Sequence, residues 1–251
     1  MFLAPVIVMV TGAFREAGAP PPTSIELLPR PLSTANFAGA AELVDLGRQA
    51  VNSLLVAAMA VPLAVAVASM AGFALARLGG RVATSVAVAA IVALMVPATA
   101  LFVGRFWVFR TLGVTDTWVP LVAPALLGMS PLYVLVYVWS FRRIPSELFD
   151  AARLEGLTPL RTWWRVGMPL VRPITGAVAV LAFVASWNDF IDPLLYLFDS
   201  RLYTLPLGLR SLATLDAPYA PYMLAGALMA TVPVVVAFLL GQRAFGRGTG
   251  R

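Results

Sequence analysis

The chain has 251 residues, of which 60% are hydrophobic and only 12% are charged, and its mean hydropathy is +0.87. Soluble domains carry about a quarter charged residues, so this composition predicts an integral membrane protein. The formal net charge is +6, but no basic block carries the interleaved aromatic residues expected for nucleic-acid binding. The chain contains no cysteine, histidine or lysine. This excludes disulfides, Cys/His zinc sites, His-dependent triads and a Walker-type phosphate loop, so we expect no enzyme activity here and, if ATP drives the protein, a partner that binds it.

Long apolar segments predict an all-α protein with six membrane spans, because a helix needs about 20 apolar residues to cross a bilayer. We place the spans at residues 1–14, 50–76, 82–104, 119–141, 174–198 and 219–245, within a single domain over 1–251. The first is short and lacks the basic region of a secretory signal. We therefore expect either a partial first helix or a native start upstream of Met1.

The connections between the spans are more polar. Prolines exclude a long helix from residues 15–47, which we expect to be an irregular outer loop. Residues 105–118 are predicted as a short polar connection, and residues 199–218 as a second outer loop. Pro97 predicts a kink in the third span, because proline removes a helical hydrogen bond.

The stretch 142–173 cannot lie in lipid, because it holds six arginines together with several acidic residues. Its local chemistry predicts two short helices. Ser146 is placed to cap the first, Gly156 to end it, and Thr158 with Pro159 to begin the second. A further break is expected between Pro169 and Pro173.

Within this stretch, the sequence Asp150-Ala151-Ala152, followed by Gly156 and later by Pro169, resembles the cytoplasmic EAA loop of ABC importer permeases. That family has glutamate where this chain has Asp150, and leucine where it has Met168. In the family this loop is the coupling helix, which docks into a groove on the ATP-binding subunit. The resemblance implies the same docking role here for Glu147, Asp150, Ala151, Ala152, Gly156 and Pro169. An amphipathic helix on the membrane surface is the alternative, but it does not account for the Ala-Ala, Gly and Pro spacing.

A second polar cluster falls in the second half of the fifth span, where a charge facing lipid would cost about 2.5–3.5 kcal/mol. Its Trp187, Asn188 and Phe190 resemble the Trp-Asn-x-Phe motif of the carbohydrate-uptake branch of the same family. We expect Trp187, Asn188 and Asp189 to lie on the substrate path. In the alternative, Trp187 belongs to the aromatic belt at the membrane boundary and Asp189 faces outer water.

Shorter matches extend the resemblance from about Pro5 to Gly241. They are a short helix around Asn36-Phe37, the end of the second span at Gly72–Arg77, and the turn Gly113–Thr117. Together they imply the type I permease fold of ABC importers.

Arginine placement predicts the orientation. With six spans, 11 of the 18 arginines lie on the side of the 142–173 loop and the C-terminus. Short loops rich in arginine stay in the cytoplasm. We therefore place the loop and the C-terminus on the cytoplasmic side of a bacterial or archaeal cell membrane.

The resemblance implies a permease subunit of an ATP-driven, binding-protein-dependent importer of the maltose type, for a sugar or oligosaccharide. Its partners would be a second homologous permease, two ATP-binding subunits that use ATP and Mg, and an extracytoplasmic solute-binding protein. No cofactor or metal is expected on this chain. An importer for polyamine, phosphate or peptide is an alternative. A membrane-embedded enzyme or channel would need an intramembrane acidic cluster or a filter. The sequence leaves open which sugar is carried and which permease contacts it.

Overall fold

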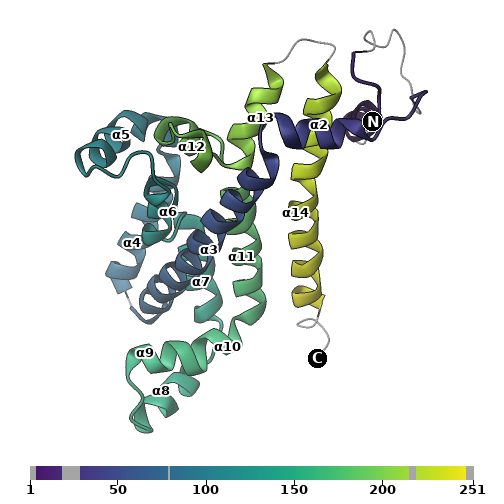
Figure 1. Ribbon diagram of the computed structural model, residues 1–251. Coiled ribbons are helices and arrows are strands. Elements are labelled where there is room, and N and C mark those ends of the chain that lie inside the picture. Colours follow the sequence, from purple (N-terminus) through teal and green to yellow (C-terminus); the bar gives the residue numbers. More distant parts are fainter. Residues whose placement is uncertain (1–3, 19–28, 79, 215–218, 247–251) are drawn as a thin grey trace. The chain divides into compact units, whose positions relative to one another are not determined.

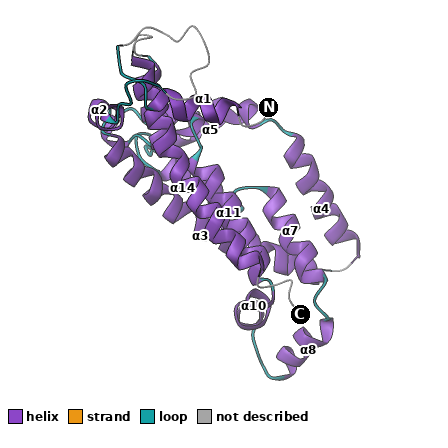
Figure 2. Cartoon of the chain, turned by 90° about the vertical axis from the view of Figure 1, so that its right-hand side faces the viewer, coloured by secondary structure: helices purple, strands orange, loops and turns teal. Residues whose placement is uncertain are grey.

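The computed structural model describes residues 4–18, 29–78, 80–214 and 219–246, which form helices and loops (Figures 1 and 2). Over these ranges the one β pairing is an isolated bridge between Arg15 and Leu32. Three helices are long and apolar enough to cross a membrane, namely Leu46–Arg77, Val119–Arg142 and Ala220–Gly241. Counting each of two sharply bent helix pairs as one span gives up to five. The fold is that of an all-α membrane protein, as predicted.

The helices follow one another in a simple order. They are α1 (Ala4–Ala13), α2 (Ala35–Leu43), α3 (Leu46–Arg77), α4 (Gly80–Met95), η1 (Ala98–Leu101), α5 (Phe102–Thr111), α6 (Val119–Val122), η2 (Ala123–Leu127), α7 (Pro131–Arg142), α8 (Ser146–Leu154), α9 (Pro159–Thr162), the π-helical turn η3 (Trp163–Gly167), α10 (Met168–Leu170), α11 (Arg172–Trp187), α12 (Ile191–Tyr196), η4 (Ser200–Leu202), α13 (Leu205–Ala213) and α14 (Ala220–Gly246).

The chain forms two compact units. Unit 1 comprises Met1–Leu55, Asp116–Trp118 and Trp187–Ala237, and unit 2 comprises Val56–Thr115, Val119–Ser186 and Phe238–Arg251. Several predicted spans are therefore shared between the units, and the single domain over residues 1–251 stays a prediction.

Small residues let the helices of unit 2 approach closely. Ala60, Ala64 and Ala68 recur every four residues on α3 and are fully buried. Four residues further on, a Cβ added at Gly72 would lie 2.4 Å from Cβ of Tyr137 on α7. Close packing of α3 against α7 therefore depends on the absence of a side chain at Gly72.

The third predicted span is broken at Pro97, where we expected a kink. The helix stops at Met95 and the chain turns through 86° into the second helical segment. The prediction of a polar connection from residue 105 is wrong, because α5 continues to Thr111. Its two arginines suggested a loop, but they alternate with aromatic and aliphatic side chains, and no proline or glycine interrupts the helix between Arg105 and Leu112.

In two further segments the structure differs from the continuous helix or the loop that we predicted. Over 174–198, α11 ends at Trp187 and α12 begins at Ile191, so the fifth span contains a non-helical break. The outer loop over 199–218 contains the helix α13, which buries Leu205, Leu207 and Leu212. Leucines at helical spacing predict a helix here, but the polar residues around them suggested a loop, so the helix was missed. Residues 215–218 of this predicted loop lie outside the described ranges.

Within unit 1, hydrogen bonds join the first half of α3 to the segment before α13. Asn52 Nδ2 donates to the carbonyl oxygens of Arg201 and Tyr203, both at 2.9 Å. The neighbouring Ser53 Oγ accepts from the backbone N–H of Leu205 at 2.8 Å. Both side chains are buried, so these bonds satisfy polar groups that would otherwise destabilise an apolar helix.

Candidate functional site

The α8 helix and its flanking turns adopt the local structure that the sequence of the 142–173 stretch predicts. Glu147 lies in the first turn of α8, where the helix dipole favours an acid. Gly156 follows the end of α8 with φ +78°, a left-handed conformation that favours glycine. Thr158 then caps α9, because its hydroxyl oxygen accepts from the N–H of Arg161 at 3.4 Å. The predicted cap at Ser146 is wrong, since Pro145 occupies the cap position and Ser146 is already helical.

One face of α8 is anchored in unit 2. Phe149 is 2% exposed, and its ring meets that of Phe73 on α3 edge-on, with 5.6 Å between centroids. The guanidinium carbon of Arg77 lies 4.6 Å from the centre of the Phe149 ring. Phe73 in turn packs edge-on against Phe141 of α7 at 5.3 Å. Phe149 thus connects α8 to α3, and Phe73 continues the contact to α7.

The opposite face of α8 is open. Glu147, Leu148, Asp150, Ala151 and Leu154 are exposed there, with Leu154 at 91%. Ala152 is buried, so the two adjacent alanines of the motif face different surroundings. Asp150 is not free, because its Oδ1 lies 3.7 Å from Arg77 Nη2 and 3.8 Å from Arg153 Nη1. At these lengths the ion pairs orient the helix more than they stabilise it.

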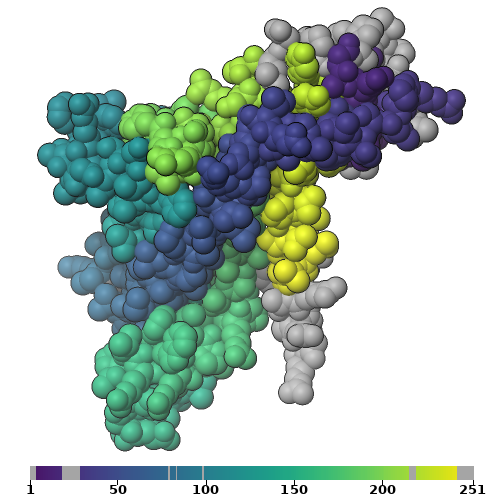
Figure 3. Space-filling view, in the orientation of Figure 1, coloured from purple at the N-terminus to yellow at the C-terminus, as the bar shows by residue number. Residues whose placement is uncertain are grey.

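Exposed apolar side chains continue beyond α8. Leu160, Trp164 and Leu170 are between 50% and 64% exposed, on or next to α9 and α10. Segments α8 to α10 lie at one end of the unit 2 helices, past the ends of α7 and α11 (Figures 1 and 2). In the space-filling view they form a protruding surface (Figure 3). An apolar surface on a protruding segment is typical of a protein-binding site.

Pro169, the last residue of the predicted motif, lies exposed on α10, immediately before the chain turns by 88° into α11. The turn is made at Val171, between Pro169 and Pro173, as the two prolines predict. Just before it, Gly167 faces the ring of Phe141, which an added Cβ would approach to 3.1 Å. The loop therefore returns to the same aromatic cluster that holds Phe149.

The second predicted region, Trp187 to Asp189, lies in the break between α11 and α12. Trp187 is 1% exposed, and its Nε1 donates to the carbonyl oxygen of Ala230 on α14 at 3.0 Å. Asn188 is exposed, and Asp189 is partly buried. Asp189 Oδ1 accepts from the N–H of Asp192 at 3.2 Å, which caps the start of α12. Of the three side chains, only that of Asn188 is exposed at the surface of this chain.

Sequence reasoning missed the function of Asp116. It has φ +57°, and its Oδ1 accepts from the N–H groups of Phe198 and Asp199, both at 2.9 Å. The side chain of Asp199 in turn binds Arg201, and hydrogen bonds from that residue hold the pKa of the Asp199 carboxyl below its ordinary value. The signal was present in the predicted turn at Gly113–Thr117, since aspartate and asparagine tolerate the left-handed conformation. The sequence did not indicate that the Asp116 side chain would accept hydrogen bonds from a distant loop.

Over the described ranges, no group of three or more acidic side chains lies close enough together to hold a metal ion.

Comparison with known proteins relates this arrangement to transport systems. The arabinooligosaccharides transport system permease protein AraQ of Halalkalibacterium halodurans is 32% identical over 194 residues, covering 77% of this chain and 69% of that protein. The melibiose/raffinose/stachyose import permease protein MelC of Bacillus subtilis is 28% identical over 220 residues, covering 87% and 80%.

The fold has a counterpart among solved structures. A chain of a bacterial ABC transporter involved in the import of the acidic polysaccharide alginate matches 97% of this chain and 91% of its own length, with a TM-score of 0.80 at 17% identity. The model of the family described as binding-protein-dependent transport system inner membrane component matches residues 60–249. This chain is accordingly a multi-pass membrane protein, and it belongs to the family of binding-protein-dependent transport system inner membrane components.

Proposed function

We propose that this chain is the membrane-spanning permease subunit of an ATP-driven importer for a sugar or oligosaccharide. The observation that carries the proposal is the protruding α8 helix, open on one face and joined on the other through Phe149 to Phe73 of α3, which packs against α7. The names of the two relatives support a sugar as the substrate, as does the Trp-Asn-x-Phe motif at Trp187. Two ATP-binding subunits would use ATP and Mg, and this chain would bind no cofactor.

In this proposal the open face of α8 docks into one ATP-binding subunit. Leu148, Ala151 and Leu154 offer an apolar, partly small surface, and Glu147 adds a charge at its edge. Gly156 lets the chain reverse directly after the helix, and Pro169 begins its return to the spans. When the docked subunits move, Phe149 transmits the displacement to Phe73, because a close-packed side chain cannot be shifted without moving its neighbours.

The sugar path belongs to the break between α11 and α12. Asn188 is exposed on this chain, and its amide both donates and accepts hydrogen bonds, as sugar hydroxyls require. Asp189 lies beside it and adds an acceptor. Trp187 is buried, so we assign it a positioning role: its bond to Ala230 holds the break against α14. A non-helical backbone at membrane depth is tolerated where it lines a cavity or is covered by protein.

The full assembly would contain a second, homologous permease and an extracytoplasmic solute-binding protein. The α8 loop and the C-terminus would face the cytoplasm, as the arginine distribution favours. The solute-binding protein would then meet the opposite membrane surface.

Reconstitution tests this function. The chain, its neighbouring permease, the ATP-binding subunits and the solute-binding protein are placed in liposomes, and uptake of labelled oligosaccharides is measured with ATP inside. We expect uptake that requires every component, and Gly156→Trp to abolish it while the subunits still insert and co-purify. Gly156→Ala, which also meets the left-handed backbone but adds only a methyl group that has no neighbour within 4 Å, should retain part of the uptake. Normal uptake by Gly156→Trp at wild-type abundance, or ATP hydrolysis by the isolated chain, would refute the proposal.

A further inference from the structure

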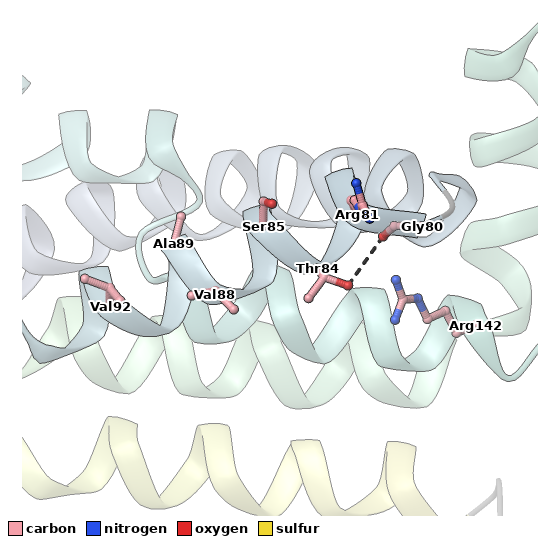
Figure 4. Close-up of a pocket in the computed structure, with 8 residues that line it drawn as sticks. All are labelled: Gly80, Arg81, Thr84, Ser85, Val88, Ala89, Val92 and Arg142. Atoms are coloured by element: carbon pink, nitrogen blue, oxygen red, sulfur yellow. Dashed lines mark hydrogen bonds between the residues drawn. The ribbon is translucent and has the colours of Figure 1, made fainter.

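A cavity of about 940 Å³ lies open on the surface of unit 2, between α4 and the end of α7. Its lining combines Arg81, Thr84, Ser85 and Val88 of α4 with Arg142 of α7 (Figure 4). Neither the proposed α8 docking face nor the 187–192 break contributes to it. The cavity is therefore a separate feature that the transport function does not explain.

The mouth of the cavity carries excess positive charge. Arg81 and Arg142 are both exposed, and within the described part of the chain no carboxylate forms an ion pair with either. In Figure 4 the Arg142 guanidinium extends toward the first turn of α4, where the Thr84 hydroxyl donates to the carbonyl oxygen of Gly80 at 3.4 Å. Two guanidinium groups with hydroxyls beside them match the hydrogen-bonding needs of a phosphate group.

An apolar crevice of about 250 Å³ continues from this mouth between α4 and α7. It shares Ala89 and Arg142 with the cavity, and Ala90, Leu135 and Val138 are among the residues that line its inner part. A free phosphate ion would occupy only the cationic mouth. An amphipathic anion would occupy both parts.

We propose that this cavity binds an anionic phospholipid, with the headgroup phosphate between Arg81 and Arg142 and an acyl chain along the crevice. The position fits the bilayer: Arg81 lies at the start and Arg142 at the end of apolar helices, where headgroups meet the hydrocarbon core. Basic pockets between membrane helices are a recurrent form of lipid recognition. The lipid would tie α4 to α7 at the end of unit 2 from which the α8 segment leaves.

Native mass spectrometry of the assembled transporter tests the site. The complex is purified in detergent and titrated with phosphatidylglycerol or with phosphatidylcholine of the same acyl chains. We expect phosphatidylglycerol to be retained more strongly. The double substitution Arg81→Gln with Arg142→Gln should weaken its retention about 30-fold, since each arginine near a membrane surface contributes about fivefold to the binding of anionic lipid.

Two further variants make the result specific. Arg143→Gln removes the neighbouring charge, which lies over the Trp139 ring at 3.6 Å rather than in the cavity, and should leave lipid retention unchanged. Val88→Trp keeps every charge but fills the space beside the mouth, and should weaken retention. The proposal is overturned if the double variant retains phosphatidylglycerol like the wild type, or if both lipids bind equally. It is also overturned if inorganic phosphate alone displaces the lipid, or if the assembled complex retains none because another subunit covers the cavity.

Discussion

Phe149 is the residue on which the attachment of α8 depends most. Its ring is enclosed by Phe73 and Arg77, and truncation of a buried phenylalanine typically costs about 3–5 kcal/mol. We expect Phe149→Ala to leave the ATP-binding subunits bound and hydrolysing ATP, while uptake per ATP in liposomes falls severalfold. Phe149→Leu keeps much of the apolar volume, so its uptake per ATP should lie between that of Phe149→Ala and that of the wild type. Unchanged uptake per ATP in Phe149→Ala would mean that the force travels along the backbone instead.

Asn188 is the residue best placed to meet a sugar in the break after α11. We expect Asn188→Ala to reduce oligosaccharide uptake and substrate-stimulated ATP hydrolysis by about tenfold, because one lost hydrogen bond in a binding site is worth about 1.5 kcal/mol. Co-purification with the ATP-binding subunits should persist. The exposed Ser211 of α13 offers a matched control, since Ser211→Ala alters a polar group outside the break.

Substitution at Asp189 completes this test. Asp189→Asn keeps the Oδ1 acceptor that caps α12 and removes only the charge, so it separates the cap from a direct role in sugar binding. If Asn188→Ala and Asp189→Ala both transported normally, the cluster would serve helix packing alone, and sugar contact would belong to the partner permease.

At the scale of single elements, the turn at Asp116 shows how one side chain shapes a distant loop. Asp116→Ala removes the acceptor of two backbone N–H groups and should destabilise the loop by about 2 kcal/mol, lowering the thermal unfolding temperature of the purified protein. Asp116→Asn keeps an amide oxygen and tolerates the left-handed backbone. It should therefore unfold close to the wild-type temperature. An equal fall of the unfolding temperature in both variants would mean that the charge of Asp116, rather than its two hydrogen bonds, stabilises the loop.

The elements that could be predicted from the sequence are those with strong local signals. Gly156 and the Thr158-Pro159 pair mark the turn between α8 and α9 by backbone preference alone, and Pro97 marks the end of α4. Helices α5 and α13 were missed, because arginines and serines among apolar residues suggest a loop when no partner surface is known. For α13 that surface includes α14: an added Cβ at Gly226 would lie 2.7 Å from Leu209 and 3.1 Å from Leu212.

The candidate sites likewise could be predicted where local signals decide the structure, and not where distant contacts do. Glycine, proline and acid spacing indicated where α8 would lie, but not that Ala152 would be buried beside an exposed Ala151. Trp187 was expected on the substrate path, and its side chain is buried and donates a hydrogen bond to the carbonyl oxygen of Ala230, 43 positions along the chain. Contacts at such separation depend on how the helices pack, and a single sequence does not specify that packing.

For the whole molecule, we expect the open face of α8 to meet an ATP-binding subunit. The chain has no native cysteine, so one introduced thiol gives a unique attachment point. Three positions suit the comparison. Ala151 is exposed on α8, Ala152 is buried on the same helix, and Ser211 is exposed on α13.

The most direct measurement is crosslinking of the assembled importer through single cysteines, with the linked partner identified by mass spectrometry. A short thiol-reactive photocrosslinker placed at Ala151→Cys should link the chain to an ATP-binding subunit. Ala152→Cys should react poorly because of its burial, and Ser211→Cys should not reach that subunit. Failure of Ala151→Cys to link to any ATP-binding subunit in an active complex, or its linkage to the solute-binding protein instead, would show that α8 does not dock there.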